Sequence, residues 1–91
     1  KGRNPRDTAR VLTEVSETLQ RYDGPWQDGA LEAVVRTYAE GIAWETRDLF
    51  MTLRVAITGR TASPPLFATM QVLGQAVCLT RFEDAVAMLQ K

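Results

Sequence analysis

Apolar side chains recur every three or four positions along most of this chain, the spacing that places them on one face of an α-helix. The first run of this kind contains Val11, Leu12, Val15, Leu19 and Tyr22. Asn4 is a suitable N-cap for it and Pro5 a suitable first residue, whereas the Gly24-Pro25 pair stops it. The pattern therefore predicts a first helix from about Pro5 to the residues before Gly24.

Four further segments have the same period. The second begins near Gln27 or Asp28, and Trp26 just before it is positioned to pack back on Leu31 as a hydrophobic staple. The third covers about 45–58 and ends at Gly59, where a left-handed terminating residue is expected.

The fourth helix is expected to open with Ser63 as its cap and with Pro64 and Pro65 in its first turn, where missing N–H groups cost least. Gly74 ends this helix. A fifth helix follows over about 75–89.

The pattern predicts an all-α protein, a compact bundle of about five helices in a single domain over residues 1–91. The apolar, β-branched stretch at 55–58 is too short and too well embedded in a helical pattern to indicate a strand. Domains of this size bury only a little over ~60% of their unfolded surface, so we expect modest stability.

The composition fits a soluble globular domain, with 45% hydrophobic and 24% charged residues. Membrane-spanning helices need about 20 apolar residues in a row, and this chain has no such run and no signal-peptide pattern. We therefore expect a cytoplasmic protein with no membrane partner. The chain starts at Lys1 rather than at methionine, which suggests a piece of something longer.

Catalysis by this chain alone is disfavoured. Cys78 is the only cysteine and there is no histidine, so neither a zinc cluster nor a Ser-His-Asp or Cys-His system can be assembled. Glu83 and Asp84 are adjacent, but neighbours on a helix point about 100° apart and do not form a facing acid–base pair. We expect no active site, metal or cofactor here.

The charges are balanced, with eleven acidic and eleven basic residues, so net charge gives no argument for nucleic acid. Residues 61–80, however, carry no charge at all. Such a stretch is either core or contact surface. One hypothesis is therefore a helical protein–protein interaction module that docks a partner on the 61–80 face.

Three short runs indicate another function: LRVAITG at 53–59, SPPLF at 63–67 and LG at 73–74. They resemble the C-terminal signature of bacterial glutamyl-tRNA synthetase, in which a helix with an L-R-x-A-x-T-G stretch ends at a glycine and the following loop leads into a helix that opens on proline. The likeness covers residues 8–90 in order. It departs at Thr52, where relatives usually have proline.

The resemblance implies an anticodon-binding subdomain of the class I synthetase type, taken from the C-terminal part of a longer glutamate–tRNA ligase. The expected partners are the anticodon loop of tRNA-Glu and the remainder of the synthetase chain, and no DNA. The ATP and Mg of the parent enzyme would belong to that remainder, because this chain lacks the nucleotide-binding domain.

The resemblance also implies a set of contact residues. By position in the motif, the residues that touch the anticodon are Arg36, Arg54, Ser63, Pro64 and Leu66. Arg54 would donate to a cytosine edge and Ser63 to a uracil, since proteins recognise unpaired bases by stacking on them and hydrogen-bonding their edges.

Each of these residues also has a structural interpretation. Arg54, in the last turns of its helix, would interact favourably with the helix dipole in any protein. Arg36 is equally compatible with a solvated helix face, Leu66 with the core, and Pro64 with simple helix initiation. Ser63 can cap its helix and contact a base at once.

Three more residues invite functional interpretations but favour packing. Trp26 and Trp44 each flank a helix end, where an aromatic side chain usually seals the core rather than stacking on a base. Cys78 lies in an apolar seam and is expected to be packed rather than reactive.

Overall fold

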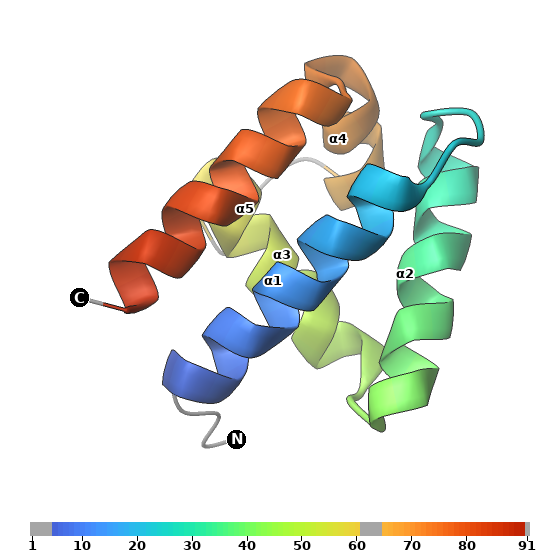
Figure 1. The fold of residues 1–91 in the computed structure, drawn as a ribbon. Coiled ribbons are helices and arrows are strands. Elements are labelled where there is room, and N and C mark those ends of the chain that lie inside the picture. Colours follow the sequence, from blue (N-terminus) through green and yellow to red (C-terminus); the bar gives the residue numbers. More distant parts are fainter. Residues whose placement is uncertain (1–4, 61–64, 91) are drawn as a thin grey trace.

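The computed structural model describes residues 5–60 and 65–90 of the 91. They form five helices and, within these ranges, no strand, which confirms the all-α prediction (Figure 1). The helices are α1 (Pro5–Arg21), α2 (Asp28–Ile42), α3 (Thr46–Thr58), α4 (Leu66–Leu73) and α5 (Gln75–Leu89). The described part is about as deep as it is wide, with extents of 32 × 26 × 24 Å.

Most helix boundaries agree with the sequence pattern. Gly59 ends α3 with φ 75° and Gly74 separates α4 from α5 with φ 88°, the left-handed backbone that glycine adopts without strain. The predicted start of α1 at Pro5 and the extent of α5 are also confirmed. Asn4, the predicted cap of α1, lies outside the described residues.

The observed start of α4 differs from the predicted one. Pro65 was expected inside the first turn, but it precedes the helix in an extended conformation with φ −51° and ψ 134°. Its carbonyl accepts the first helical hydrogen bond, from Thr69 N at 3.0 Å. An N-cap residue has this extended backbone while its carbonyl already accepts a helical bond, so Pro65 is the cap and Leu66 the first helical residue.

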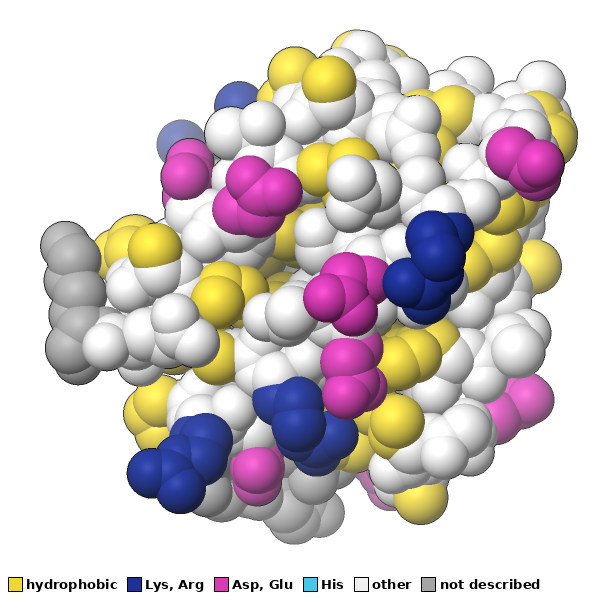
Figure 2. Space-filling model, in the orientation of Figure 1, with side chains coloured by type: hydrophobic (Ala, Val, Ile, Leu, Met, Phe, Trp, Pro, Cys, Tyr) yellow, Lys and Arg dark blue, Asp and Glu magenta, His cyan; other side chains and the backbone are white. Residues whose placement is uncertain are grey.

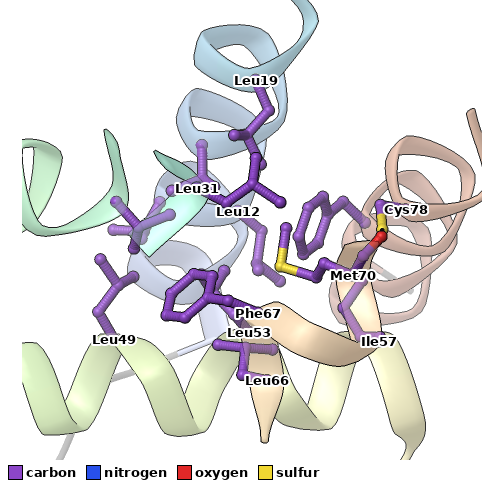
Figure 3. Close-up of a cluster of buried hydrophobic side chains, with 14 of the residues drawn as sticks. Leu12, Leu19, Leu31, Leu49, Leu53, Ile57, Leu66, Phe67, Met70 and Cys78 are labelled. Atoms are coloured by element: carbon purple, nitrogen blue, oxygen red, sulfur yellow. The ribbon is translucent and has the colours of Figure 1, made fainter. Parts of the chain in front are cut away.

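All five helices contribute to one core (Figure 3). Figure 3 shows Phe67 and Met70 of α4 between Leu12 on α1 and Leu53 on α3. The most extensive helix–helix contact joins α1 and α5, which lie antiparallel: the start of α5 reaches the end of α1 through a bond from Gln75 Nε2 to Leu19 O, 2.9 Å. Within the described ranges, no helix is both long enough and apolar enough to cross a membrane.

Candidate nucleic-acid interface

Arg54 lies on α3, one turn from its end, and its side chain is partly buried. The guanidinium Nε is fully buried and has no hydrogen-bond partner among the described residues. Leaving a buried donor unpaired costs about 1–3 kcal/mol, more when the group is charged. Such an exception to normal pairing requires an explanation, and an acceptor brought by a ligand is one.

The end of α3 is held by several hydrogen bonds. Arg81 on α5 donates from Nη1 to Ile57 O at 2.6 Å, and Thr58 donates from Oγ1 to Arg54 O at 2.8 Å. The Arg60 backbone N–H in turn donates to Thr58 Oγ1, 3.1 Å. The Arg81 bond satisfies a carbonyl that the helix end leaves free, and the two Thr58 bonds connect the last turn of α3 to the residue where the chain leaves it.

Arg36, on α2, makes two contacts. Its Nε donates to Glu32 Oε2 at 2.8 Å, and its guanidinium carbon lies 5.2 Å from the centre of the Phe50 ring. About half of the Arg36 side chain remains exposed. Arg36 is therefore not simply solvated, because a cation over a ring face gains about 0.5–1 kcal/mol at an exposed site.

Phe50 joins the surroundings of Arg36 to the face of α3 that carries Arg54. The sequence pattern did not identify it as a site residue. The residue lies four positions before Arg54, on the same face of α3, and its ring meets the edge of Phe67 with centroids 4.9 Å apart at 80°. Phe67 is in the first turn of α4. The structure thus brings Arg36 and Arg54 to one region beside the start of α4, with Phe50 between their helices.

Of the other three predicted contact residues, the structure describes only Leu66. Ser63 and Pro64 lie outside the described residues. Leu66 is only 3% exposed and belongs to the core, so its main role is packing (Figure 3). The prediction that Leu66 also touches a base stays a prediction.

The two tryptophans are structural. Trp44 is buried, and Trp26 packs against the core while its Nε1 donates to Met70 O at 2.8 Å, which joins the entry of α2 to α4. This bond satisfies the indole N–H and confirms that Trp26 contributes to packing. Thr52, where the sequence departs from the family pattern, is an ordinary helical residue whose Oγ1 donates to Asp48 O, 3.0 Å.

Two buried groups have raised pKa values. Burial raises the pKa of the Cys78 thiol to about 11, partly offset by the nearby Arg81 charge, so this cysteine is packed as predicted. Burial, followed by the hydrogen bond to the Glu14 carboxylate, raises the pKa of Tyr38 as well. Neither group is at the candidate interface.

Charge is mixed on the surface. In Figure 2, basic and acidic side chains alternate on the face drawn, so this face presents no uniform field to RNA phosphates.

The uncharged stretch at 61–80 is divided, where it is described, between core and surface. Leu66, Phe67, Met70 and Cys78 are buried, and the large apolar side chains left exposed are Val72 and Val77. A groove of about 780 Å³ between α1, α3 and α5 also has apolar side chains in its lining. A docking face at 61–80 stays a prediction.

Comparison with known proteins assigns the family. The profile of the family described as "Anticodon binding domain" matches residues 1–86. The chain is 35% identical over 86 residues to a glutamate–tRNA ligase of Herpetosiphon aurantiacus, an alignment that covers 94% of this chain and 17% of that protein. It is 45% identical over 65 residues to the glutamate–tRNA ligase of Roseiflexus castenholzii, covering 71% of this chain and 13% of that one.

A third relative, glutamate–tRNA ligase 1 of Syntrophomonas wolfei, is 37% identical over 81 residues, with 89% of this chain and 16% of the relative covered. The chain thus spans about a sixth of the length of the curated relatives it matches. The resemblance of the 53–74 region is confirmed by these matches, and the all-α architecture agrees with them. This chain belongs to the anticodon-binding domain family.

Proposed function

We propose that this chain recognises the anticodon loop of a glutamate tRNA, as part of a glutamate–tRNA ligase. The family assignment and the names of the relatives support the general role, and the placement of Arg36 and Arg54 supports the site. In this proposal Arg54 donates to the edge of a cytosine and Ser63 to a uracil, the first two bases of the anticodon, with Pro64 and Leu66 beside them.

The unpaired Nε of Arg54 is the observation that carries the proposal. A charged group that is buried without an acceptor destabilises the free protein. Because Nε itself is closed to solvent, the acceptors that RNA brings would bind the other guanidinium nitrogens of Arg54 and offset part of this penalty. Bonds from a charged donor are also stronger than neutral ones, which makes this contact well suited to discriminate between bases.

The mode of binding follows from the balanced charge. With zero net charge, the domain gains little from general attraction to phosphates, so we expect weak binding that depends on a few directed contacts. Unpaired bases provide such contacts because their faces and Watson–Crick edges are free.

The reaction of the ligase would require other parts of the enzyme. Within the described ranges no group of three or more His, Cys, Asp and Glu side chains could hold a metal ion. In this proposal ATP and Mg belong to the remainder of the ligase, with which this domain would cooperate in the cytoplasm.

The test is to titrate the 91-residue protein at low salt with an anticodon stem-loop RNA of tRNA-Glu. We expect Arg54→Ala to weaken binding about tenfold. Arg6→Ala, which removes the same charge from an exposed position on α1, is the matched control and should bind like the parent. Equal affinities for Arg54→Ala and the parent protein would overturn the assignment of Arg54.

A further inference from the structure

The Arg36 side chain is anchored from two directions. Its Nε is bonded to the Glu32 carboxylate, one turn earlier on α2, and its guanidinium carbon lies over the Phe50 ring of α3, 5.2 Å from the ring centre. Within residues 5–60 and 65–90, the hydrogen bonds of Arg36 use Nε alone. The two anchors thus leave the terminal nitrogens for another acceptor.

The Phe50 anchor is itself supported by the core. Its ring packs edge-on against Phe67, 4.9 Å between centroids, and Phe67 is only 7% exposed. The buried Phe67 ring thus supports the Phe50 ring, and the Phe50 ring supports the exposed Arg36 guanidinium. An arginine on an open helix face has no such support.

A second ion pair in the same molecule provides the comparison. Arg10 and Glu14 have the same i,i+4 spacing and similar side-chain exposure, 55% and 42% against 52% and 41% for Arg36 and Glu32. Their closest contact is 3.6 Å rather than 2.8 Å. A contact of that length at an exposed site contributes little.

We propose that Glu32 and Phe50 are positioning residues, which hold the Arg36 guanidinium so that its two terminal nitrogens form a preset fork for paired acceptor oxygens or a base edge of bound RNA. This inference rests on the proposed function and deepens it. A guanidinium is planar and can donate two parallel bonds, so fixing its plane fixes which acceptors it fits. Each anchor would raise the population of the anchored Arg36 conformation, relative to all others, by a factor of about two to five.

Glu32 also repels phosphates, so its removal has two opposite effects. Losing the anchor reduces the fit to the correct loop, whereas losing the negative charge raises affinity for any RNA. Affinity alone would not separate these effects. The ratio of affinities for a matched and a mismatched loop does, because general attraction acts on both.

The experiment measures dissociation constants for two stem-loops: one with the glutamate anticodon, and one with its first two bases changed. The test variants are Glu32→Gln and Phe50→Leu. Glu17→Gln, which removes a charge from exposed α1, is the control for charge, and Phe50→Tyr, which keeps the ring, is the control for Phe50→Leu. Thermal unfolding checks that every variant is folded.

We expect Glu32→Gln and Phe50→Leu each to lower the matched-to-mismatched ratio about threefold, the loss of one anchor, while both controls keep the parent ratio. Unchanged ratios in both test variants would overturn the positioning roles. A higher affinity of Glu32→Gln for both loops at an unchanged ratio would show that Glu32 only repels RNA, which also overturns its role.

Nuclear magnetic resonance of the free protein gives a readout that does not depend on RNA. The Arg36 Nε–H signal should exchange slowly with solvent in the parent and become fast in Glu32→Gln. Fast exchange in the parent would overturn the anchoring itself. A parent protein that fails to distinguish the two loops would instead overturn the proposed function, whatever the state of Arg36.

Discussion

Arg81 donates a hydrogen bond from Nη1 to the backbone carbonyl of Ile57, across 2.6 Å. The bond joins the middle of α5 to the last turn of α3, three residues after Arg54. Because cations near a helix C-terminus also interact favourably with its dipole, this contact stabilises the segment of α3 that carries the candidate site. The sequence analysis placed Arg81 in the last helix but gave it no role.

Removing the Arg81 contact should lower both the stability of the protein and its affinity for RNA. Arg81→Ala should lower the free energy of unfolding by about 1.5–3 kcal/mol, because it removes a charge-assisted bond to a helix-end carbonyl. Binding of the anticodon stem-loop should weaken as well, although Arg81 is not proposed to touch RNA. Urea unfolding and RNA titration of the same samples measure both quantities. If Arg81→Ala unfolded like the parent, this bond would not contribute to the structure.

The unpaired Nε of Arg54 predicts opposite effects on stability and binding. Arg54→Met keeps most of the aliphatic packing and removes the buried donor, so the free energy of unfolding should stay equal or rise by about 1 kcal/mol. RNA binding should fall about tenfold, as for Arg54→Ala. Chemical unfolding together with titration gives the comparison. A loss of more than about 1 kcal/mol in Arg54→Met would mean that the guanidinium is satisfied in the free protein.

Arg60 is exposed just beyond the end of α3. The salt dependence of binding would distinguish a phosphate contact by Arg60 from the base contact proposed for Arg54. If Arg60 contacts a phosphate, Arg60→Ala should weaken binding to matched and mismatched loops alike. It should also reduce the slope of log affinity against log salt by roughly one. Titrations at several salt concentrations measure this slope. Binding insensitive to salt would instead indicate apolar docking of the kind expected for a protein interaction module.

Side chains in the same helix should differ sharply in their contribution to stability. Phe82 is fully buried in the core, so Phe82→Ala should cost about 3–5 kcal/mol. Met88 is 71% exposed at the edge of the groove between α1, α3 and α5, so Met88→Gln should change stability by less than about 0.5 kcal/mol. Thermal or urea unfolding measures both. Similar losses in the two variants would contradict the orientation of α5.

Cys78 predicts a decrease of stability in alkali. Its pKa is raised from 9.0 to about 11 in the folded protein, so its contribution is complete below pH 9 and is lost as the pH rises from about 9 to 11. The parent should therefore lose more stability over this range than Cys78→Ala does. Urea unfolding at a series of pH values measures the difference between them. Parallel pH profiles for the two proteins would contradict the raised pKa.

The helices could be predicted because local rules determine them. The left-handed glycines Gly59 and Gly74 mark helix ends in the sequence as clearly as in the structure. Pro65 was misplaced by one position because proline is most common in the first turn of a helix, whereas its ψ of 134° places it at the cap.

The arrangement of the site depends on contacts between helices, which periodicity does not reveal. Arg36 and Arg54 could be proposed from motif positions, but the role of Phe50 could not, because an aromatic residue on an apolar stripe is normally core. Its spacing of four from Arg54 was the only available signal. The pairing of Arg36 with Glu32 was visible as an i,i+4 pattern, yet such pairs are common on helices and carry little information alone.

The antiparallel contact between α1 and α5 joins the first and last helices of the domain. Contacts between distant parts of a sequence slow folding, because the loop between them must close first. During synthesis, the side of α1 that packs on α5 would stay uncovered until α5 has emerged from the ribosome. Chains that stop before α5 should therefore be targets for chaperones and proteases, and this domain should complete its folding only after nearly all of it has been made.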